Sequence, residues 1–298
     1  MGGLDGRVAV VVGASRGIGK GIALELGAAG AHVVVAGRTL DPPAGHPGGP
    51  HDGPSDGPAS DGPGGSLSET AAAIVGSGGS AEARRCDFLD EESVARLFSE
   101  LRSDHGRVDV LVNSAFNARQ FGASIGRRFW ELPASLWHDV VDVGTRTAYT
   151  ACVHAAPLLI GSGGGLIVNV SARGAERYLY NVAYGVGKAA LDRMTRDMAQ
   201  ELADHRVGVV SLWPNVTATE GLVGSKAART RAAATFGDLD RLETPRYSGR
   251  AVVALASDPE MMARTGQRFW VAELGAAYGF TDENGRTHPW PRSDSPRS

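Results

Sequence analysis

Cysteine is scarce in this 298-residue chain, which has only Cys86 and Cys152. A disulfide framework needs more cysteines, and a zinc knuckle needs closely spaced pairs of them. Both thiols are therefore expected to be free and buried, which suits a reducing cytoplasm. Long apolar runs are also missing, and the N-terminus has no basic segment before an apolar one. The sequence predicts a cytoplasmic protein without a membrane span or an export signal.

Lysine is a further scarcity, with 3 lysines against 27 arginines. The formal net charge is −3, so the chain has no general electrostatic attraction for nucleic acid or anionic lipid. No nucleic-acid partner is predicted, and chemistry on small molecules is favoured. Because arginine is the usual cation of this chain, Lys188, four residues after Tyr184, is a candidate for a role that needs lysine in particular.

Short β-branched segments, by contrast, are abundant and alternate with helical patterns. Helical periodicity is clear in EESVARLFSELRSDHG, where Val94, Leu97, Phe98 and Leu101 share one face. The alternation predicts an α/β fold: a single doubly wound Rossmann-type domain with a mostly parallel central sheet flanked by helices. The candidate strands are 7–13, 31–37, 108–114, 165–171 and 207–213, with 81–88 as another central strand and 266–272 as a late one.

Three segments interrupt this pattern. Residues 41–65 contain seven prolines and eight glycines, so they are predicted to be a disordered insertion. Its two histidines are expected to be solvated rather than metal ligands, and no metal site is predicted. Residues 217–249 form a long connection, and residues from about 283 to 298 form a polar C-terminal tail.

A glycine-rich segment, VVVGASRGIGKGIALEL, directly follows the first candidate strand and opens the first helix. Gly13, Gly17 and Gly19 allow a sharp turn and a close approach to a pyrophosphate, whose charge the helix N-terminus favours. The simpler alternative is a tight strand-to-helix connection. Placement between strand and helix near the N-terminus favours dinucleotide binding, although the spacing is GxxxGxG and not the commoner GxGxxG.

Ser171 ends a predicted strand, where the ligand crevice of a doubly wound sheet lies. Tyr184 and Lys188 share one face of a helix, so the ammonium can lie near the phenol or share a ribose hydroxyl with it. Together with an oxidised nicotinamide ring, the lysine would lower the pKa of the phenol toward working pH. The alternative is an ordinary surface pair on an amphipathic helix.

The order GxxxGxG, LVNSA, Ser171 and Tyr184-x-x-x-Lys188 resembles the short-chain dehydrogenase/reductase family over nearly the whole chain. The resemblance implies an oxidoreductase that forms a homodimer or homotetramer and interconverts a carbonyl and an alcohol. Ser171 would polarise the carbonyl, Tyr184 would transfer the proton, and Lys188 would orient the ribose. The resemblance also implies a substrate loop at 217–249. The implied cofactor-binding residues are Gly13, Ser15, Arg16, Gly17, Ile18, Gly19, Arg38, Asp87, Asn113, Tyr184, Lys188, Thr217 and Thr219.

Two positions depart from the family pattern. The family often has an asparagine in the helix before the serine strand, which completes a proton relay, and this chain has Gly144 there. The family's Pro-Gly after the sixth strand is Pro214-Asn215, where asparagine also tolerates a positive φ. The first departure puts the rate of the reaction in doubt more than its type.

The choice of nicotinamide depends on the end of the second strand. NAD-preferring sites usually place an acidic residue there, and this chain has Arg38, with Arg16 in the glycine loop as a second cation. Both indicate NADP(H). The alternative is that Arg38 is solvated and Asp41 folds back to the ribose.

The substrate is predicted to be a hydrophobic ketone, aldehyde or steroid-like compound. Aromatic side chains could form its pocket or belong to the core or a subunit interface; they are Phe116, Trp130, Tyr178, Tyr180 and Trp213. Reduction of a C=C bond is a second possible reaction, although it usually accompanies a different spacing around the active tyrosine. The non-enzymatic alternative is a nucleotide-sensing or scaffold protein that has kept the fold and lost turnover.

Overall fold

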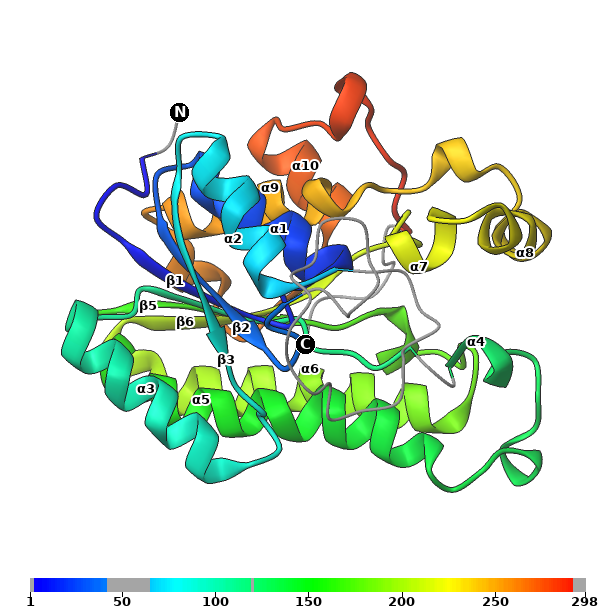
Figure 1. Cartoon of the computed structure of the whole chain (residues 1–298), viewed down its shortest axis with the longest axis horizontal. Coiled ribbons are helices and arrows are strands. Elements are labelled where there is room, and N and C mark those ends of the chain that lie inside the picture. The colour runs from blue at the N-terminus through cyan, green and yellow to red at the C-terminus, as the bar shows by residue number, and fades with distance from the viewer. Residues whose placement is uncertain (1–2, 42–64, 119–120, 292–298) are drawn as a thin grey trace.

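The computed structural model describes residues 3–41, 65–118 and 121–291. The predicted insertion lies outside these residues except for its two ends, Asp41 and Gly65. The described part of the chain contains a seven-stranded, entirely parallel sheet in the order β3-β2-β1-β4-β5-β6-β7 (Figure 1). Its strands are β1 (Val8–Val12), β2 (His32–Gly37), β3 (Ser80–Arg85), β4 (Val110–Asn113), β5 (Gly165–Val170), β6 (Val207–Trp213) and β7 (Arg268–Trp270).

The strand order reverses at β1, which pairs with β2 on one side and β4 on the other. Val12 at the end of β1 is in register with Ala36 of β2 and with Asn113 of β4. In an open parallel sheet a ligand crevice lies outside the carboxyl ends of the strands at such a reversal. The predicted doubly wound fold is confirmed, and its topology places the candidate site beyond the ends of β1 and β4.

Helices cover both faces of the sheet. Figure 1 shows α1, α2, α9 and α10 on one face, and α3, α5 and α6 on the other. Their bounds are α1 (Gly17–Ala28), α2 (Leu67–Gly76), α3 (Glu91–His105), α4 (Phe121–Ser124), α5 (Thr147–Gly161), α6 (Val182–Leu202), α7 (Glu220–Val223), α8 (Lys226–Phe236), α9 (Pro245–Ser257) and α10 (Val271–Tyr278). Among the described helices, none combines the length and apolarity that crossing a bilayer requires.

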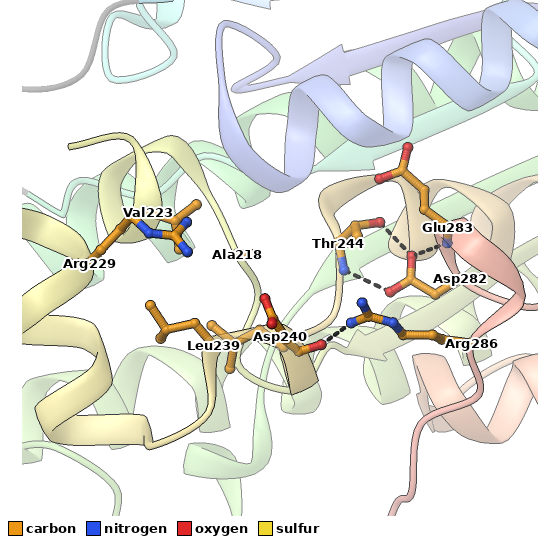
Figure 2. Close-up of a pocket in the computed structure, with 10 residues that line it drawn as sticks. Ala218, Val223, Arg229, Leu239, Asp240, Thr244, Asp282, Glu283 and Arg286 are labelled. Carbon is orange, nitrogen blue, oxygen red and sulfur yellow. Dashed lines mark hydrogen bonds between the residues drawn. The ribbon is translucent and has the colours of Figure 1, made fainter. Parts of the chain in front are cut away.

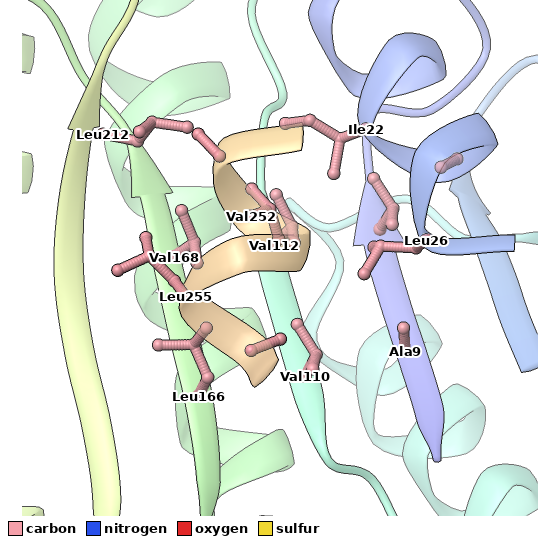
Figure 3. Close-up of a cluster of buried hydrophobic side chains, with 14 of the residues drawn as sticks. Ala9, Ile22, Leu26, Val110, Val112, Leu166, Val168, Leu212, Val252 and Leu255 are labelled. Atoms are coloured by element: carbon pink, nitrogen blue, oxygen red, sulfur yellow. The ribbon is translucent and has the colours of Figure 1, made fainter. Parts of the chain in front are cut away.

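Two buried apolar layers hold the sheet between the helices. In the layer on the α1 side, strand side chains such as Val112 and Val168 meet Leu26 of α1 and Leu255 of α9 (Figure 3). On the other side the predicted helix face of α3 packs against alternate residues of β1 and β2. Truncating one of these large side chains to alanine typically costs about 2–5 kcal/mol of unfolding free energy. The layers make the sheet a stable base for the loops at its carboxyl edge.

The segment around β3 differs from the sequence prediction. It was expected to be a central strand, but β3 pairs only with β2 and forms an edge of the sheet. Its side chains are partly exposed, which explains how charged residues such as Glu82 and Arg84 are accommodated. The two cysteines are free and buried as predicted, and burial raises the pKa of Cys152 to about 12.

The chain on either side of residues 42–64 is joined by backbone hydrogen bonds. The amide of Leu67 donates to the carbonyl of Thr39, and that of Ser68 donates to Leu40. Ser66 then caps α2 in a reciprocal arrangement with Glu69. The two ends of the inserted segment therefore lie beside each other at the end of β2.

Residues 217–249 contain more regular structure than a loop. They include α7 and α8, and their last part begins α9, which belongs to the core. The predicted polar tail also differs in its first part, residues 283–291. His288 there is buried against Asp282, with 2.8 Å between Nε2 and Oδ2, and Trp290 packs on the α1-side layer.

Candidate active site

The turn between β1 and α1 is built for backbone contact. Gly13 has φ +81°, and a Cβ there would lie 2.8 Å from the backbone nitrogen of Ala115. A Cβ on Gly19 would lie 2.2 Å from the carbonyl oxygen of Gly13. Both positions therefore exclude any side chain, as the sequence predicts for a loop whose backbone approaches a ligand closely.

The N-terminus of α1 already binds a negatively charged oxygen. The backbone amide of Gly17 donates to Oε2 of Glu220 at 2.8 Å. Exposed amides and the helix dipole favour an anion here, and the carboxylate occupies the kind of position that a phosphate oxygen would take. Arg16, just before the helix, is exposed, while Ser15 and Ile18 are half-buried. These residues fit the pyrophosphate of a nicotinamide dinucleotide.

The connection after β6 contacts the same turn. The methyl carbon of Thr219 lies 3.3 Å from where a Cβ on Gly17 would be. Thr217 is buried, and its hydroxyl donates to the carbonyl of Asn215 at 3.0 Å. Thr219, a sequence-predicted site residue, therefore lies beside the glycine turn.

Asn215 does not use the positive φ that the sequence analysis allowed for. Only Tyr180 and Arg206 have positive φ among the described non-glycine residues. Instead, the amide and side chain of Asn215 donate to the two carboxylate oxygens of Glu243 at 3.0 and 2.8 Å. Burial raises the pKa of Glu243 to about 7, against the effect of these hydrogen bonds. A side-chain contact thus shapes the turn that glycine shapes in the family.

The residues predicted to read the adenosine half lie at the ends of β2 and β3. Arg38 and Asp87 are both exposed. Asp87 accepts a hydrogen bond from the amide of Leu89, which fixes the turn before α3. Asp41 accepts from the hydroxyl of Ser68 at 2.8 Å, so its carboxylate faces the start of α2.

Asn113, at the end of β4, faces the interior. Its Nδ2 donates to Oδ1 of Asn169 at 2.9 Å, and Asn169 in turn donates to the hydroxyl of Thr195 in α6. This buried chain of amides ties β4 and β5 to α6. Asn113 therefore contributes to the site indirectly, by fixing where the ends of β4 and β5 lie.

Ser171 and Lys188 are in direct contact where β5 meets α6. The hydroxyl of Ser171, which is buried, donates to the backbone carbonyl of Lys188 at 3.1 Å. The ammonium of Lys188 donates to the carbonyl of Val170 at 2.9 Å. The helix carrying Lys188 begins with a side-chain cap, because Asn181 accepts from the amide of Tyr184. These contacts bring the strand end and the helix face together, as the sequence predicts.

Tyr184 is buried in an aromatic cluster. The rings of Phe121, Tyr180 and Phe116 have centroids 5.1, 5.2 and 6.2 Å from that of Tyr184. The ammonium of Lys188 lies 5.8 Å from the centre of the Tyr184 ring. Phe116 and Tyr180 are the sequence-predicted candidates for pocket walls in this cluster, whereas no sequence motif marks Phe121.

The other aromatic candidates lie elsewhere. Trp213 is fully buried, where it packs against Trp270, with ring centroids 5.4 Å apart. Trp130 and Tyr178 are exposed over 69% and 73% of their surface. They contribute neither to the core nor to the cluster around Tyr184.

The protein's own groups do not lower the pKa of Tyr184. Burial raises the pKa of Tyr184, and neighbouring Tyr180 adds to the effect. Burial lowers the pKa of Lys188 to about 8, although part of its side chain remains accessible. The phenol is therefore protonated at neutral pH, and a lower pKa caused by Lys188 together with an oxidised nicotinamide stays a prediction.

Asp192 lies one helical turn beyond Lys188, and the sequence analysis missed it. Its Oδ1 accepts hydrogen bonds from the hydroxyl of Ser211 at 2.5 Å and from the indole of Trp213 at 3.2 Å. Burial raises the pKa of Asp192, whereas its charge raises the pKa of Lys188. A carboxylate four residues after the lysine was the only available sequence signal.

Gly144, where the family often has asparagine, lies in a π-helix over His138–Arg146 that continues directly into α5. The wider turn is visible in the amide of Thr147, which donates to the carbonyl of Asp142, five residues back. A Cβ on Gly144 would have no atom within 4 Å. The position is therefore open enough for a side chain, and π-turns often occur at functional sites.

A separate cavity of about 160 Å³ lies between residues 217–249 and the C-terminal residues. Figure 2 shows Thr244 bonded to Asp282, and Arg286 reaching the backbone of Asp240. Ser171, Tyr184 and Lys188 do not line this cavity. Val223 of α7 and Arg229 of α8 are among the residues that line it.

Comparisons with known proteins agree with this geometry. The family described as Enoyl-(Acyl carrier protein) reductase matches residues 63–273, and the family described as short chain dehydrogenase matches residues 7–46. Dehydrogenase/reductase SDR family member 1 of Mus musculus is 39% identical over 290 residues, which cover 95% of this chain and 85% of the relative.

Two further proteins resemble the chain more distantly. The 7alpha-hydroxysteroid dehydrogenase of Escherichia coli K12 is 28% identical over 74% of each chain. The crystal structure of a metagenomic short-chain oxidoreductase in complex with NADP is 26% identical. It has a TM-score of 0.65 and covers 90% of this chain and 96% of its own. This chain belongs to the short-chain dehydrogenase/reductase family and is an NAD(P)-dependent oxidoreductase.

Proposed function

We propose that this enzyme uses NADP(H) to interconvert a hydrophobic ketone, aldehyde or steroid-like carbonyl compound and its alcohol. The observation that carries the proposal is the meeting of Ser171, Lys188 and Tyr184 beside an apolar cluster at the carboxyl end of β5. A hydroxyl, a phenol and an ammonium can together bind a carbonyl oxygen and transfer a proton to it.

When bound, the nicotinamide supplies the hydride for reduction or accepts it in oxidation. The hydroxyl of Ser171, which donates to the Lys188 carbonyl, turns to donate to the substrate oxygen. Tyr184 gives its phenolic proton to that oxygen. The Lys188 ammonium, which donates to the Val170 carbonyl, would hold the ribose of a bound nucleotide, and its charge would stabilise the phenolate that remains.

Reduction is the direction that the protonation state favours. Because burial raises the pKa of Tyr184, the phenol holds its proton at neutral pH and is a donor. Oxidation needs the phenolate, so we expect its rate to increase with pH. The ratio of the two initial rates across pH 6–10 measures this difference.

An apolar substrate fits the surroundings of the phenol. Leu136, Val140 and Tyr184 form a buried cluster, and Phe121 and Leu179 pack against it. A charged group of a substrate placed against these apolar side chains would lose its hydration without gaining an ion pair with them. The name of the hydroxysteroid dehydrogenase relative supports the same class of substrate.

Substitution of Tyr184 by phenylalanine tests the assignment. It removes the proton donor and none of the proposed cofactor contacts of the glycine loop. We expect kcat to fall by about 10²- to 10⁴-fold. Binding of NADPH, followed by its fluorescence, should change little. Tyr149→Phe, at an exposed tyrosine of α5, is the matched control. Activity of Tyr184→Phe within a few-fold of the parent would refute the role.

A carbonyl panel separates the alternatives. Turnover of ketones and aldehydes, measured by loss of the reduced nicotinamide absorbance, supports the proposed reaction. Including α,β-unsaturated compounds and identifying the product distinguishes C=O from C=C reduction, which the Enoyl-(Acyl carrier protein) reductase family description raises. Cofactor binding without turnover across the panel would instead favour a nucleotide sensor or scaffold.

We also propose a homodimer or homotetramer in the cytoplasm. Exposed apolar side chains on α5, Tyr149 and Val153, support self-association, and the two free cysteines suit a reducing compartment. Light scattering coupled to size exclusion measures the assembly. A monomer at micromolar concentration would contradict it.

A further inference from the structure

Two histidines and a glutamate meet at the edge of the sheet, away from the active site. His32 is the first residue of β2, Glu82 lies in β3, and His105 is the last residue of α3. Nε2 of His105 lies 3.0 Å from Oε1 of Glu82, and Nε2 of His32 lies 3.8 Å from the same oxygen. One ligand atom from each residue lies within 4.8 Å of the other two.

We propose that His32, Glu82 and His105 form a structural site for a divalent transition ion, with zinc as its natural occupant. Two imidazole nitrogens and one carboxylate oxygen are a preferred zinc ligand set. Ligand atoms around tetrahedral zinc lie about 3.4 Å apart, given metal–ligand bonds of about 2.1 Å. The two nitrogen-to-oxygen spacings bracket that value, and all three ligand atoms lie within 4.8 Å of one another, so small side-chain movements close the site around an ion.

His32 carries a nitrogen that the fold leaves unused. Its buried Nε2 has no hydrogen-bond partner among the described residues, whereas its Nδ1 lies 2.7 Å from the hydroxyl of Ser80. A proton on Nδ1, donated to Ser80, leaves the lone pair on Nε2, which is the tautomer that binds a metal. An unpartnered buried nitrogen costs stability, and an ion would satisfy it.

The carboxylate is oriented in the same way. Oε2 of Glu82 accepts from Arg84 at 2.8 Å, which leaves Oε1 facing the two histidines. Arg84 also pairs with Asp104 and Glu100. With neutral histidines, three carboxylates and one guanidinium leave two negative charges in this group, which match a divalent cation. Partners behind the ligands, such as Ser80 and Arg84, are typical of metal sites.

Accessibility and position fit a structural role. The three ligand side chains are 20–27% exposed, so an ion can enter from solvent. His105 ends α3 next to the αL residue Gly106, while His32 and Glu82 lie on adjacent strands. An ion there would join the end of α3 to β2 and to the edge strand β3. It would stabilise the folded chain in proportion to its affinity.

Titration of the full-length protein with Zn²⁺ tests the site. In competition with a fluorescent zinc chelator, we expect the first equivalent of Zn²⁺ to bind more tightly than any later equivalent. Binding should weaken at least about tenfold in His105→Gln, which can still donate to Glu82, and in Glu82→Gln. Ser80→Ala should give a smaller loss of affinity than either ligand variant. His205→Gln, at an exposed histidine elsewhere, should bind like the parent.

Two further readouts separate a built site from adventitious binding. Zinc at a hundredfold excess over its dissociation constant should raise the melting temperature of the parent by about 3–5 °C, reversibly with EDTA, and leave that of His105→Gln unchanged. Co²⁺ bound to the parent should give the strong visible absorption of tetrahedral coordination. The proposal would be overturned if the parent and His105→Gln had equal zinc affinity. It would also be overturned if His205→Gln lost as much zinc affinity as His105→Gln. NADPH-dependent turnover of His105→Gln should match the parent, which keeps this test independent of the proposed reaction.

Discussion

The carboxylate of Glu220 accepts a hydrogen bond from the backbone amide of Gly17 at 2.8 Å, although 203 positions separate the two residues. Glu220 is the first residue of α7, and Gly17 is the first of α1. The contact closes the connection after β6 onto the glycine turn. A pyrophosphate bound at α1 would need the same amide, so nucleotide and carboxylate compete for it.

Removing this carboxylate should therefore strengthen nucleotide binding. In Glu220→Ala we expect the dissociation constant for NADPH to fall about two- to fivefold, the equivalent of one charge at a helix N-terminus. Fluorescence titration measures it, and Glu201→Ala, at an exposed glutamate of α6, is the control. Weaker binding in Glu220→Ala would show that the carboxylate supports the nucleotide site instead of competing for it.

Lys188 should lower the stability of the nucleotide-free protein. Burial lowers its pKa to about 8 from 10.5, so the cost of burying the charge is complete below pH 8 and disappears as pH rises toward 10.5. We expect Lys188→Met to raise the melting temperature at pH 7 and to lose activity. The gain over the parent should shrink steadily between pH 8 and 10.5.

The control for Lys188→Met is Lys226→Met, which alters an exposed lysine at the start of α8. It should change the melting temperature little at any pH. Removing Lys188 also removes its hydrogen bond to Val170, which is worth about 1 kcal/mol and opposes the gain. A lower melting temperature for Lys188→Met at pH 7 would mean that this contact outweighs the buried charge.

Asp192 should act on the reaction through Lys188. Its negative charge raises the pKa of the lysine, which favours the ammonium form. Asp192→Asn keeps a hydrogen-bond acceptor for Ser211 and removes the charge, so the pKa of Lys188 should fall further. We expect the alkaline limb of the kcat/KM profile for reduction to move to lower pH, and Asp192→Glu to restore part of the shift. An unshifted profile with uniformly lower activity would indicate a purely structural role.

The strands could be predicted because β-branched residues mark them locally. Their order in the sheet could not, because it depends on pairing between distant segments. The prediction that β3 is central is wrong for this reason. A run such as AEARR does not indicate how many neighbours a strand has, and the partly exposed Glu82 and Arg84 fit an edge. The helix face of α3 was predicted correctly because its four apolar residues repeat at helical spacing and all are buried.

The central residues of the candidate site could be predicted from the topology. The carboxyl ends of parallel strands share one edge, so a hydroxyl after β5 and a helix face following it converge there. Phe121 and Glu220 could not be predicted, because each is brought to the site by a contact that no short motif contains. For Asp192 the spacing of four residues from Lys188 was a signal, but it did not indicate the contacts with Ser211 and Trp213. The cluster of His32, Glu82 and His105 has ligands 50 and 23 positions apart, and no zinc motif has that spacing.

We expect the choice between NADPH and NADH to depend on Arg38, which is exposed at the end of β2. The competing candidate, Asp41, is held by the hydroxyl of Ser68 at 2.8 Å, which directs its carboxylate to α2. Arg16 is exposed at the start of α1 and can add a second positive charge. We expect these positions to favour a 2′-phosphate, because guanidinium groups bind phosphate by paired, charge-assisted hydrogen bonds.

We therefore expect kcat/KM to be at least about tenfold higher with NADPH than with NADH, a difference of about 1.4 kcal/mol. Arg38→Asp should remove or invert this preference, because a carboxylate repels the phosphate and can accept hydrogen bonds from the ribose hydroxyls of NADH. Asp41→Asn is the matched control: if its carboxylate serves only Ser68, the preference should stay unchanged. Steady-state kinetics with one carbonyl substrate and both cofactors measures this ratio of kcat/KM values for the parent and the two variants. Equal use of the two cofactors by the parent would mean that neither residue selects between them. A preference that Arg38→Asp leaves intact and Asp41→Asn alters would assign the selection to Asp41. Retention of NADH-dependent turnover in Arg38→Asp separates a loss of phosphate recognition from a loss of the fold.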